Sequence, residues 1–383
     1  MAWLHNLIPT NVQSVLCNTV TISILFAHPG AAVAADQTYS FAEAVRHGVV
    51  DLTASPYAAV DPKNIIERLG ELNPGLVNRI GFQYSGVTMK NLDHVASYAA
   101  LIKQAYPRVR LGGGFPENLK TEYDEKLPCD GEKDARTFKA KDIGSKETST
   151  GKYVWVDIAR PAAQEYYICV GKLLITRGLS HLHFEESDNI VKQSSSAEEA
   201  IEGFKRVRNQ LLGFAKSHDV ELSFSGEPKL SQEMPLESVY LPSRFYIDKF
   251  DTQYHNRVEN HGVGVGYTYV LSPKIVEDSI KMVPPRTKVF FYIDNFDYKQ
   301  DDLRRFMELD AQNRRDLIVR SAEEAKKRGA IFVPSLNHCD GCVPAELVGD
   351  KCEVVEERKM STYNAVLCGD MDAVRRALQI DSK

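Results

Sequence analysis

Residues 180–189 read Ser180-His181-Leu182-His183-Phe184-Glu185-Glu186-Ser187-Asp188-Asn189 and predict a short strand that ends in a group of carboxylates. Side chains of an extended chain alternate between two faces, so His181, His183 and Glu185 are expected to share one face. Leu182 and Phe184 then form the opposite, apolar face. This alternation indicates a strand with one polar and one apolar side.

Helical patterns flank this strand on both sides. Residues 161–177 precede it, are rich in apolar side chains and close at Gly178, and residues 197–217 follow it. Alternating strands and helices are typical of a parallel sheet, in which ligands bind at the carboxyl ends of the strands. We therefore expect the carboxylates of residues 185–188 at the mouth of an active site.

Eight such strands can be counted along the chain. They begin near residues 49, 79, 109, 181, 220, 246, 288 and 330, and the second and sixth are expected to span 79–85 and 245–255. Eight strands with helices between them predict a (β/α)8 TIM barrel of the α/β class, and 383 residues accommodate one such domain. Residues 116–151 are polar and rich in turns, and predict a long loop, with at most a small hairpin, over the active-site face.

The N-terminal segment resembles a secretory signal peptide. The apolar run 20–27 is followed by Ala31-Ala32-Val33-Ala34-Ala35-Asp36, which suits cleavage after Ala34 or Ala35. The segment before the apolar run lacks Lys and Arg, so a disordered or core-docking N-terminus is the alternative. No later apolar run approaches the roughly 20 residues of a membrane span. The sequence thus predicts residues 1–35 as the signal, 36–383 as one catalytic barrel domain, and a secreted or periplasmic protein.

Cysteine usage agrees with export. Loss of Cys17 with the signal leaves six cysteines, an even number that permits disulfides in an oxidising compartment. Disulfides are expected among a C-terminal group, with a structural zinc site as the alternative: Cys339, Cys342, Cys352 and Cys368. Cys169 lies among apolar residues of a predicted helix and is expected to be a buried free thiol.

The composition argues against a polyanionic partner. The chain has 47 Lys and Arg against 52 Asp and Glu, a formal net charge of −5, so no basic surplus favours nucleic acid or an anionic membrane. Gly112-Gly113-Gly114 lacks the Lys-Ser/Thr of a phosphate loop, and no dinucleotide fingerprint or serine-nucleophile elbow is found. A neutral or small substrate is therefore expected.

Acidic and aromatic side chains gather at the predicted strand ends. Glycoside cleavage needs one protonated and one ionised carboxyl, and a crowded, partly apolar mouth can separate the two pKa values. We expect Glu185 or Glu186 as the acid, with Asp294 or Glu227 as its partner. The catalytic candidates are Glu185, Glu186, Glu227 and Asp294, and Glu117 lies at the end of the third strand. The substrate-binding candidates are Tyr84, Trp155, Asp157, His183, Asp251, Gln253, His255, Tyr292 and Asp297.

These features resemble the broad superfamily of TIM-barrel glycoside hydrolases, which commonly place an acid at the end of the fourth strand and its partner on a later strand. His181-x-His183-x-Glu185 looks like the D-x-D-x-E strand of chitinase-like barrels, with His in place of both Asp residues. This departure argues against the substrate-assisted mechanism of that group. The resemblance implies a secreted O-glycosyl hydrolase with a carbohydrate substrate and without a cofactor or a catalytic metal.

Two other functions fit the same residues. Glu185 or Glu186, Glu227, Asp251, His255 and Asp294 together form a ring of side chains that suits Mg²⁺, Mn²⁺ or Zn²⁺ in a metal-dependent barrel. The barrel is also compatible with a noncatalytic carbohydrate-binding protein, in which the carboxylates only hydrogen-bond sugar hydroxyls. Metal content separates the first alternative from a glycosidase, and turnover of a glycan separates the second.

Overall fold

The computed structural model describes residues 38–52, 66, 69–80, 86–129, 135–148, 151–242, 271, 273–293, 306, 309–339, 354–355, 360–365 and 368–381. All of them belong to one compact unit, Ala35–Lys383. The predicted signal peptide lies outside the described residues, and so does the predicted strand 245–255. The same is true of six candidate site residues: Tyr84, Asp251, Gln253, His255, Asp294 and Asp297.

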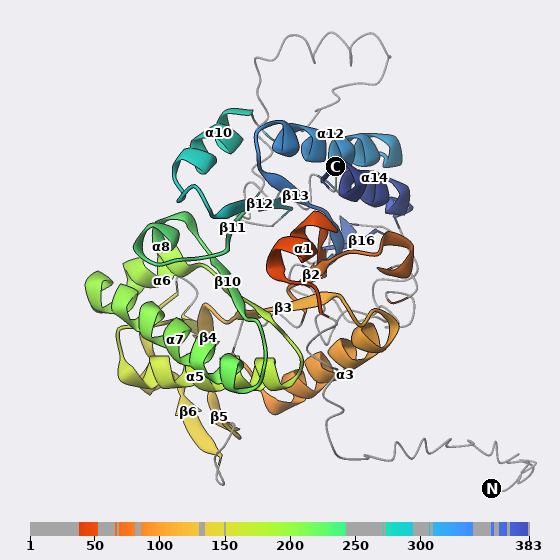
Figure 1. The fold of residues 1–383 in the computed structure, drawn as a ribbon. Coiled ribbons are helices and arrows are strands. Elements are labelled where there is room, and N and C mark those ends of the chain that lie inside the picture. The colour runs from red at the N-terminus through yellow and green to blue at the C-terminus, as the bar shows by residue number, and fades with distance from the viewer. Residues whose placement is uncertain are drawn as a thin grey trace, which may run out of the picture. The chain divides into compact units, whose positions relative to one another are not determined.

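A parallel sheet forms the centre of this unit (Figure 1). Among the described residues its nine parallel strands run in the order β13-β12-β11-β10-β9-β3-β2-β1-β14. Their bounds are β1 Val49–Leu52, β2 Leu76–Asn78, β3 Arg110–Phe115, β9 His181–Phe184, β10 Ser223–Gly226, β11 Ser238–Pro242, β12 Lys288–Tyr292, β13 Ile331–Val333 and β14 Ser335–Cys339. Two antiparallel strands, β16 (Met360–Asn364) and β15 (Val354–Val355), extend the sheet beyond β14.

The two ends of the parallel sheet meet at Pro334. This residue alone separates β13, which pairs with β12, from β14, which pairs with β1. Proline has no backbone N–H and interrupts a strand ladder, but its carbonyl accepts a hydrogen bond from the Asp51 N–H at 3.0 Å. Residues 331–339 therefore act as one interrupted eighth strand that nearly closes the sheet. The predicted α/β TIM barrel is confirmed.

Helices surround the strands (Figure 1). Their bounds are α1 Phe41–Arg46, α3 Met89–Ala105, α4 Ala140–Ile143, α5 Pro161–Thr176, α6 Ser187–Gln193, α7 Ala197–Ser217, α8 Pro228–Glu233, α10 Pro273–Lys281, α12 Ala311–Lys327 and α14 Met371–Asp381. Side-chain caps fix several starts: the Ser196 hydroxyl accepts from the Glu199 N–H at the start of α7, and the Asp310 carboxylate accepts from Asn313 at the start of α12. The predicted helices 161–177 and 197–217 are confirmed as α5 and α7.

Two strands of the barrel are formed by other residues than the sequence predicts. The second strand is β2 at 76–78 rather than 79–85, because Arg79 has a left-handed backbone (φ +58°) that ends the strand. The sixth strand of the barrel is β11 at 238–242, upstream of the predicted 245–255. This strand is short, begins just after Pro235 and ends at Pro242, so its alternation was hidden by residues that usually signal turns.

The core has two parts, one on each face of the sheet. The larger part lies between the outer face and the helices, and includes Leu182 and Phe184. A smaller apolar cluster fills one end of the barrel interior and includes Val49, Leu76, Phe290 and Val333. α1 covers this end: the Phe41 ring stacks on the His181 ring, with centroids 5.4 Å apart. The Phe41 N–H also donates to Glu221, just before β10, so α1 closes the amino-terminal end of the barrel.

The segment between β3 and α5 is more structured than predicted. Instead of a long loop with at most a small hairpin, it forms a three-stranded antiparallel sheet and a separate two-stranded one. The first is made of β4 (Asn118–Lys120), β8 (Tyr153–Val156) and β7 (Gly144–Glu147), and the second of β5 (Asp124–Leu127) and β6 (Arg136–Lys139). Its strands are short and, apart from β8, rich in charged or polar side chains, so the sequence carries little of the apolar alternation by which strands are recognised.

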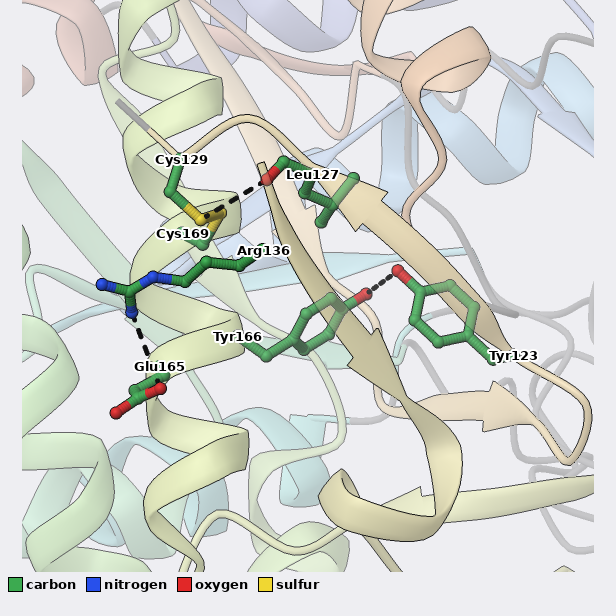
Figure 2. The surroundings of a disulfide bond; sticks show 7 residues. All are labelled: Tyr123, Leu127, Cys129, Arg136, Glu165, Tyr166 and Cys169. Atoms are coloured by element: carbon green, nitrogen blue, oxygen red, sulfur yellow. Dashed lines mark hydrogen bonds and ion pairs between the residues drawn. A yellow bond between two sulfur atoms is a disulfide. The ribbon is translucent and has the colours of Figure 1, made fainter. Parts of the chain in front are cut away.

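A disulfide ties this segment to α5 (Figure 2). It joins Cys129 to Cys169, and both cysteines are almost fully buried. The prediction of a free thiol at Cys169 was therefore wrong, since its apolar surroundings in α5 also cover the partner cysteine. Cys368 is disulfide-bonded as well, which removes it as a thiolate ligand for zinc. The side chains of Cys339, Cys342 and Cys352 lie outside the described residues.

We expect Cys129→Ala/Cys169→Ala to lower the free energy of unfolding by about 2–4 kcal/mol, because the bridge closes a loop with a sequence separation of 40 residues. Urea unfolding monitored by tyrosine and tryptophan fluorescence measures this change. Each single Cys→Ala variant loses the same bond and should show a similar loss. Equal midpoints for the double variant and the wild type would show that the bridge does not contribute to stability.

Candidate active site

The inner face of the barrel becomes polar toward the carboxyl ends of its strands. Asp51 on β1, His183 on β9, Ser225 on β10 and Tyr240 on β11 are all buried there. His181 and His183 both contact the Ser225 hydroxyl, and His183 contacts Glu185, which follows β9. The predicted sharing of one face by the two histidines and Glu185 is confirmed. Because α1 closes the opposite end, this polar end is the one at which a substrate can meet the interior.

Arg79 is the central cation of the site. Its guanidinium is 1% exposed, with Nε 3.3 Å from Glu185 Oε1 and Nη1 3.7 Å from Asp51 Oδ2. The guanidinium also lies over the Tyr292 ring, 4.8 Å from its centroid. A buried carboxylate is tolerated only beside a compensating charge, so Arg79 favours the ionised form of both acids. The sequence does not single out Arg79, because the predicted second strand begins at this residue, at the end away from the active-site face.

Glu227 has the opposite environment. Burial, followed by the charges of Glu186 and Asp188, raises the pKa of Glu227 to about 8. The side chain is fixed between the starts of α6 and α8, because Oε2 accepts from the Asp188 N–H at 2.6 Å and the Glu227 N–H donates to Ser187 Oγ at 3.0 Å. Glu227 therefore favours the protonated form, while it keeps a fixed orientation.

Glu117, directly after β3, is a second carboxyl of this kind. Burial raises its pKa well above the usual range, and the charges of Glu185 and Glu186 act in the same direction. Its Oε1 accepts from the Asn118 amide at 3.0 Å. The sequence placed Glu117 among the acidic strand ends but not among the catalytic candidates. The site thus combines an ion-paired carboxylate with two carboxyls that favour the protonated form.

The backbone is strained at two strand ends of the site. Among the described residues, four non-glycine residues have positive φ, and two of these are Arg79 (φ +58°) and Glu186 (φ +45°). A left-handed backbone costs a non-glycine residue roughly 1–3 kcal/mol and persists where the surroundings enforce it, often at functional sites. At Glu186 the strain lies at the junction of β9 and α6, where the carboxylate accepts from the Asn189 amide. The left-handed backbone of Glu186 turns the chain sharply, so that the side chains of Glu185 and Glu186 point in different directions.

Three further candidates lie in the described residues. Asp157 is fully buried, and its carboxylate accepts from the backbone and hydroxyl of Ser195 (3.2 and 3.3 Å) and pairs with Arg160 Nε at 3.0 Å. These contacts join loop segments, so we interpret Asp157 as structural. Trp155 is half-buried on β8, opposite Asn118. Tyr292 is 4% exposed and lies against Arg79, which leaves little ring surface for a sugar.

No group of three or more His, Cys, Asp or Glu side chains within the described residues has the arrangement of a metal site. Three members of the metal-binding alternative, Asp251, His255 and Asp294, lie outside those residues. No helix in the described part of the chain is long and apolar enough to cross a membrane.

Comparisons with known proteins find neither a matching protein-family model nor a matching curated protein. The neighbours among solved structures are glycoside hydrolase barrels and related enzymes. They include the glycoside hydrolase domain of PelA from Pseudomonas aeruginosa (12% identity, 75% of this chain and 93% of that chain covered, TM-score 0.44). Amy13B of Eubacterium rectale (13%, 88% and 78%, 0.48) and the debranching enzyme of Nostoc punctiforme (9%, 90% and 82%, 0.45) are also similar. These distant similarities assign no activity to this chain.

Proposed function

We propose that this protein is a glycoside hydrolase in which Glu227 is the general acid and Glu185 is the ionised partner. One observation carries the proposal: two adjacent strand ends hold carboxyls in opposite electrostatic surroundings. β9 and β10 pair with His183 opposite Ser225, so the residues two positions further along, Glu185 and Glu227, leave the sheet side by side. Glu185 pairs with Arg79, whereas the pKa of Glu227 is raised to about 8.

This difference is what glycoside cleavage requires. A protonated Glu227 can donate its proton to the departing glycosidic oxygen, and an ionised Glu185 can attack the anomeric carbon or remove a proton from water. The roles are thus the reverse of those expected from the sequence, where Glu185 or Glu186 was the acid. A carboxyl separation of about 5–5.5 Å in the substrate complex would give retention, and one of about 6.5–9.5 Å would give inversion.

The other candidates retain supporting roles in the proposal. Glu186 and Asp294 are further acids for hydrogen-bonding sugar hydroxyls or water. The proposed substrate contacts are Tyr84, Trp155, Asp251, Gln253, His255 and Asp297, whereas the buried His183 and Tyr292 contact Glu185 and Arg79 instead. We further propose that the protein is exported, because its buried Cys129–Cys169 disulfide is of the kind that persists in an oxidising compartment, and the N-terminal segment resembles a signal peptide.

A screen of polysaccharides and oligosaccharides, run with and without a chelator, tests the function. We expect turnover of at least one glycan by the wild type, unaffected by the chelator and lost in Glu185→Gln. Turnover that chelation abolishes and added metal restores would support the metal-dependent barrel instead. Sugar binding without any turnover would support the carbohydrate-binding alternative.

A further inference from the structure

A chain of buried polar contacts runs from Glu185 into the barrel, and its links beyond His183 are hydrogen bonds. Glu185 Oε2 lies 3.3 Å from His183 Nε2, and His183 Nδ1 lies 2.8 Å from Ser225 Oγ. Ser225 Oγ lies 3.0 Å from His181 Nε2, and His181 Nδ1 lies 2.8 Å from Ser223 Oγ. All five side chains are at most about one-twentieth exposed. The chain exists because β9 and β10 are in register, with His181 opposite Ser223 and His183 opposite Ser225.

With Glu185 ionised, every proton in the chain points toward its carboxylate. His183 donates from Nε2 and accepts at Nδ1 from the Ser225 hydroxyl. Ser225 in turn accepts from His181 Nε2–H, and His181 Nδ1 accepts from the Ser223 hydroxyl. Both imidazoles are neutral in this state, and every donor has one acceptor. These ring protons are assigned from the partners of each nitrogen, since a neutral imidazole donates at one nitrogen and accepts at the other.

With Glu185 protonated, the same chain can run in the opposite direction. Glu185 donates to His183 Nε2, and His183 donates from Nδ1 to Ser225. Ser225 donates to His181 Nε2, and His181 donates from Nδ1 to Ser223. The two states differ by the single proton on Glu185, and both histidines exchange tautomers between them.

At its Ser223 end, the hydrogen-bond chain can accommodate either direction of donation. Ser223 Oγ lies 3.3 Å from the Ser180 carbonyl, so its hydroxyl can donate there when it no longer donates to His181. Arg110 Nη2 lies 3.4 Å from Ser223 Oγ and 2.8 Å from the Ser180 carbonyl, and it remains a donor in both states. Burial, together with the charges of Arg110 and His183, holds the pKa of His181 well below its usual range. His181 therefore stays neutral and exchanges only its tautomer.

We propose that His183 is a positioning residue that hydrogen-bonds Glu185 in both its ionised and its protonated form, and that Ser225, His181 and Ser223 reverse direction to make this possible. Its use in catalysis rests on the function proposed above. If Glu185 acts as a base and the proton that it accepts resides on the oxygen facing His183, a fixed Nε2–H donor would point at that O–H group. A reversible chain keeps the carboxyl oriented throughout the cycle.

The charged groups around Glu185 come from several elements. They are Arg79 after β2, with Asp51 of β1 behind it, Glu117 after β3, Glu186 at the start of α6 and Glu227 after β10. Arg79 favours ionised Glu185 and Glu186 disfavours it. Glu117 and Glu227 favour the protonated form at neutral pH and then add no charge. The Tyr240 ring packs edge-on against His183, with centroids 4.9 Å apart, and limits its rotation.

Nitrogen-15 NMR of histidine-labelled protein tests the chain without any substrate. In Glu185→Gln the amide oxygen should face Arg79 Nε, which leaves the amide NH2 as a fixed donor to His183 Nε2. We therefore expect both histidines to be protonated at Nε2 in the wild type at neutral pH and at Nδ1 in Glu185→Gln. His181→Gln and His183→Gln assign the two signals among the ten histidines. Identical tautomers in both proteins, or a doubly protonated His183 in the wild type, would overturn the proposal.

The acidic limb of the pH profile of kcat/KM tests the positioning role. A glutamine at residue 183 can place its amide near the ε position of the ring, whereas an asparagine reaches only the δ position. We expect His183→Asn to move the acidic limb upward by about one pH unit, because the lost hydrogen bond is stronger to the charged carboxylate than to the neutral carboxyl, and His183→Gln to restore most of this shift. A purely structural role would lower Tm in both variants without moving the limb, and would refute positioning.

The two readouts separate this inference from the proposed function. A tautomer exchange without turnover of any glycan would reject the glycosidase proposal and leave the reversible chain standing. Glycan turnover that depends on Glu185, with unchanged tautomers and no shift of the acidic limb, would support the glycosidase proposal and reject the reversible chain.

Discussion

Glu185→Gln is expected to lower kcat for glycan hydrolysis by about 10⁴-fold or more, the usual scale for losing a group that acts directly on the reacting centre. The amide keeps the size of the carboxyl but can neither attack carbon nor accept a proton from water. Steady-state kinetics on the glycan found by screening measures the loss, and circular dichroism checks that the variant is folded. Glu186→Gln is the matched control, because its carboxylate is adjacent but only half-buried, and it should cost far less. Activity within tenfold of wild type in Glu185→Gln would exclude Glu185 as the reacting carboxylate.

Glu185→Ala distinguishes the two roles open to Glu185. If Glu185 is a nucleophile, the space left by its carboxylate admits azide, which should restore turnover of a substrate with a good leaving group. The product is then a glycosyl azide of inverted configuration. If Glu185 activates water instead, the wild-type product itself has inverted configuration, as seen by proton NMR of the first sugar released. Net retention by the wild type would exclude the role of water-activating base, and net inversion would exclude the nucleophile.

The fold followed from the sequence wherever a strand carries its own alternation. Residues 180–185 alternate polar and apolar side chains, and the structure places the two sets on opposite faces of β9. The sequence was least informative where tertiary contacts define the element. β2 is only three residues long and ends at a strained Arg79, and β11 begins just after one proline and ends at another. The positions of β2 and β11 have no strong signal in the local sequence, because neighbouring strands supply the hydrogen bonds that define both strands.

The sequence predicts the residue types of the proposed site but not the electrostatic surroundings of each carboxyl. The sequence identified Glu185 and Glu227 as strand-end acids, because parallel strands bring their carboxyl ends to one edge. It did not predict Arg79 as the partner of Glu185, since that pairing depends on where β2 ends. The proposed exchange of acid and partner roles has the same origin, because burial and nearby charges set a carboxyl pKa and neither can be read from spacing. The pairing of Cys129 with Cys169 likewise required the path of the chain between β3 and α5.

Glu227→Gln is expected to lower hydrolysis of an unactivated glycan by about 10²–10⁴-fold, the contribution typical of a general acid. The loss should be small for a 2,4-dinitrophenyl glycoside of the same sugar, because that leaving group needs no proton. The pH profile gives a second signature. Wild-type kcat/KM should fall as pH rises through about 8, where Glu227 loses its proton, and this alkaline limb should be absent in the variant. Equal losses on both substrates would assign Glu227 a role other than proton donor.

The same variant should be more stable than wild type in alkaline solution. The pKa of Glu227 is raised from 4.5 to about 8 in the folded protein, so between these values the folded state binds a proton that the unfolded chain does not. Stability from this group is therefore fully present below pH 4.5 and is lost as pH rises through 8, by roughly 1.4 kcal/mol per pH unit. Glutamine cannot ionise and avoids this loss, so the stability difference between variant and wild type should grow by a few kcal/mol from pH 5 to pH 8. Urea unfolding at both pH values measures it, with Glu233→Gln as an exterior control. Parallel stability curves would mean that Glu227 is not held protonated, and the acid would then have to be sought at Glu117.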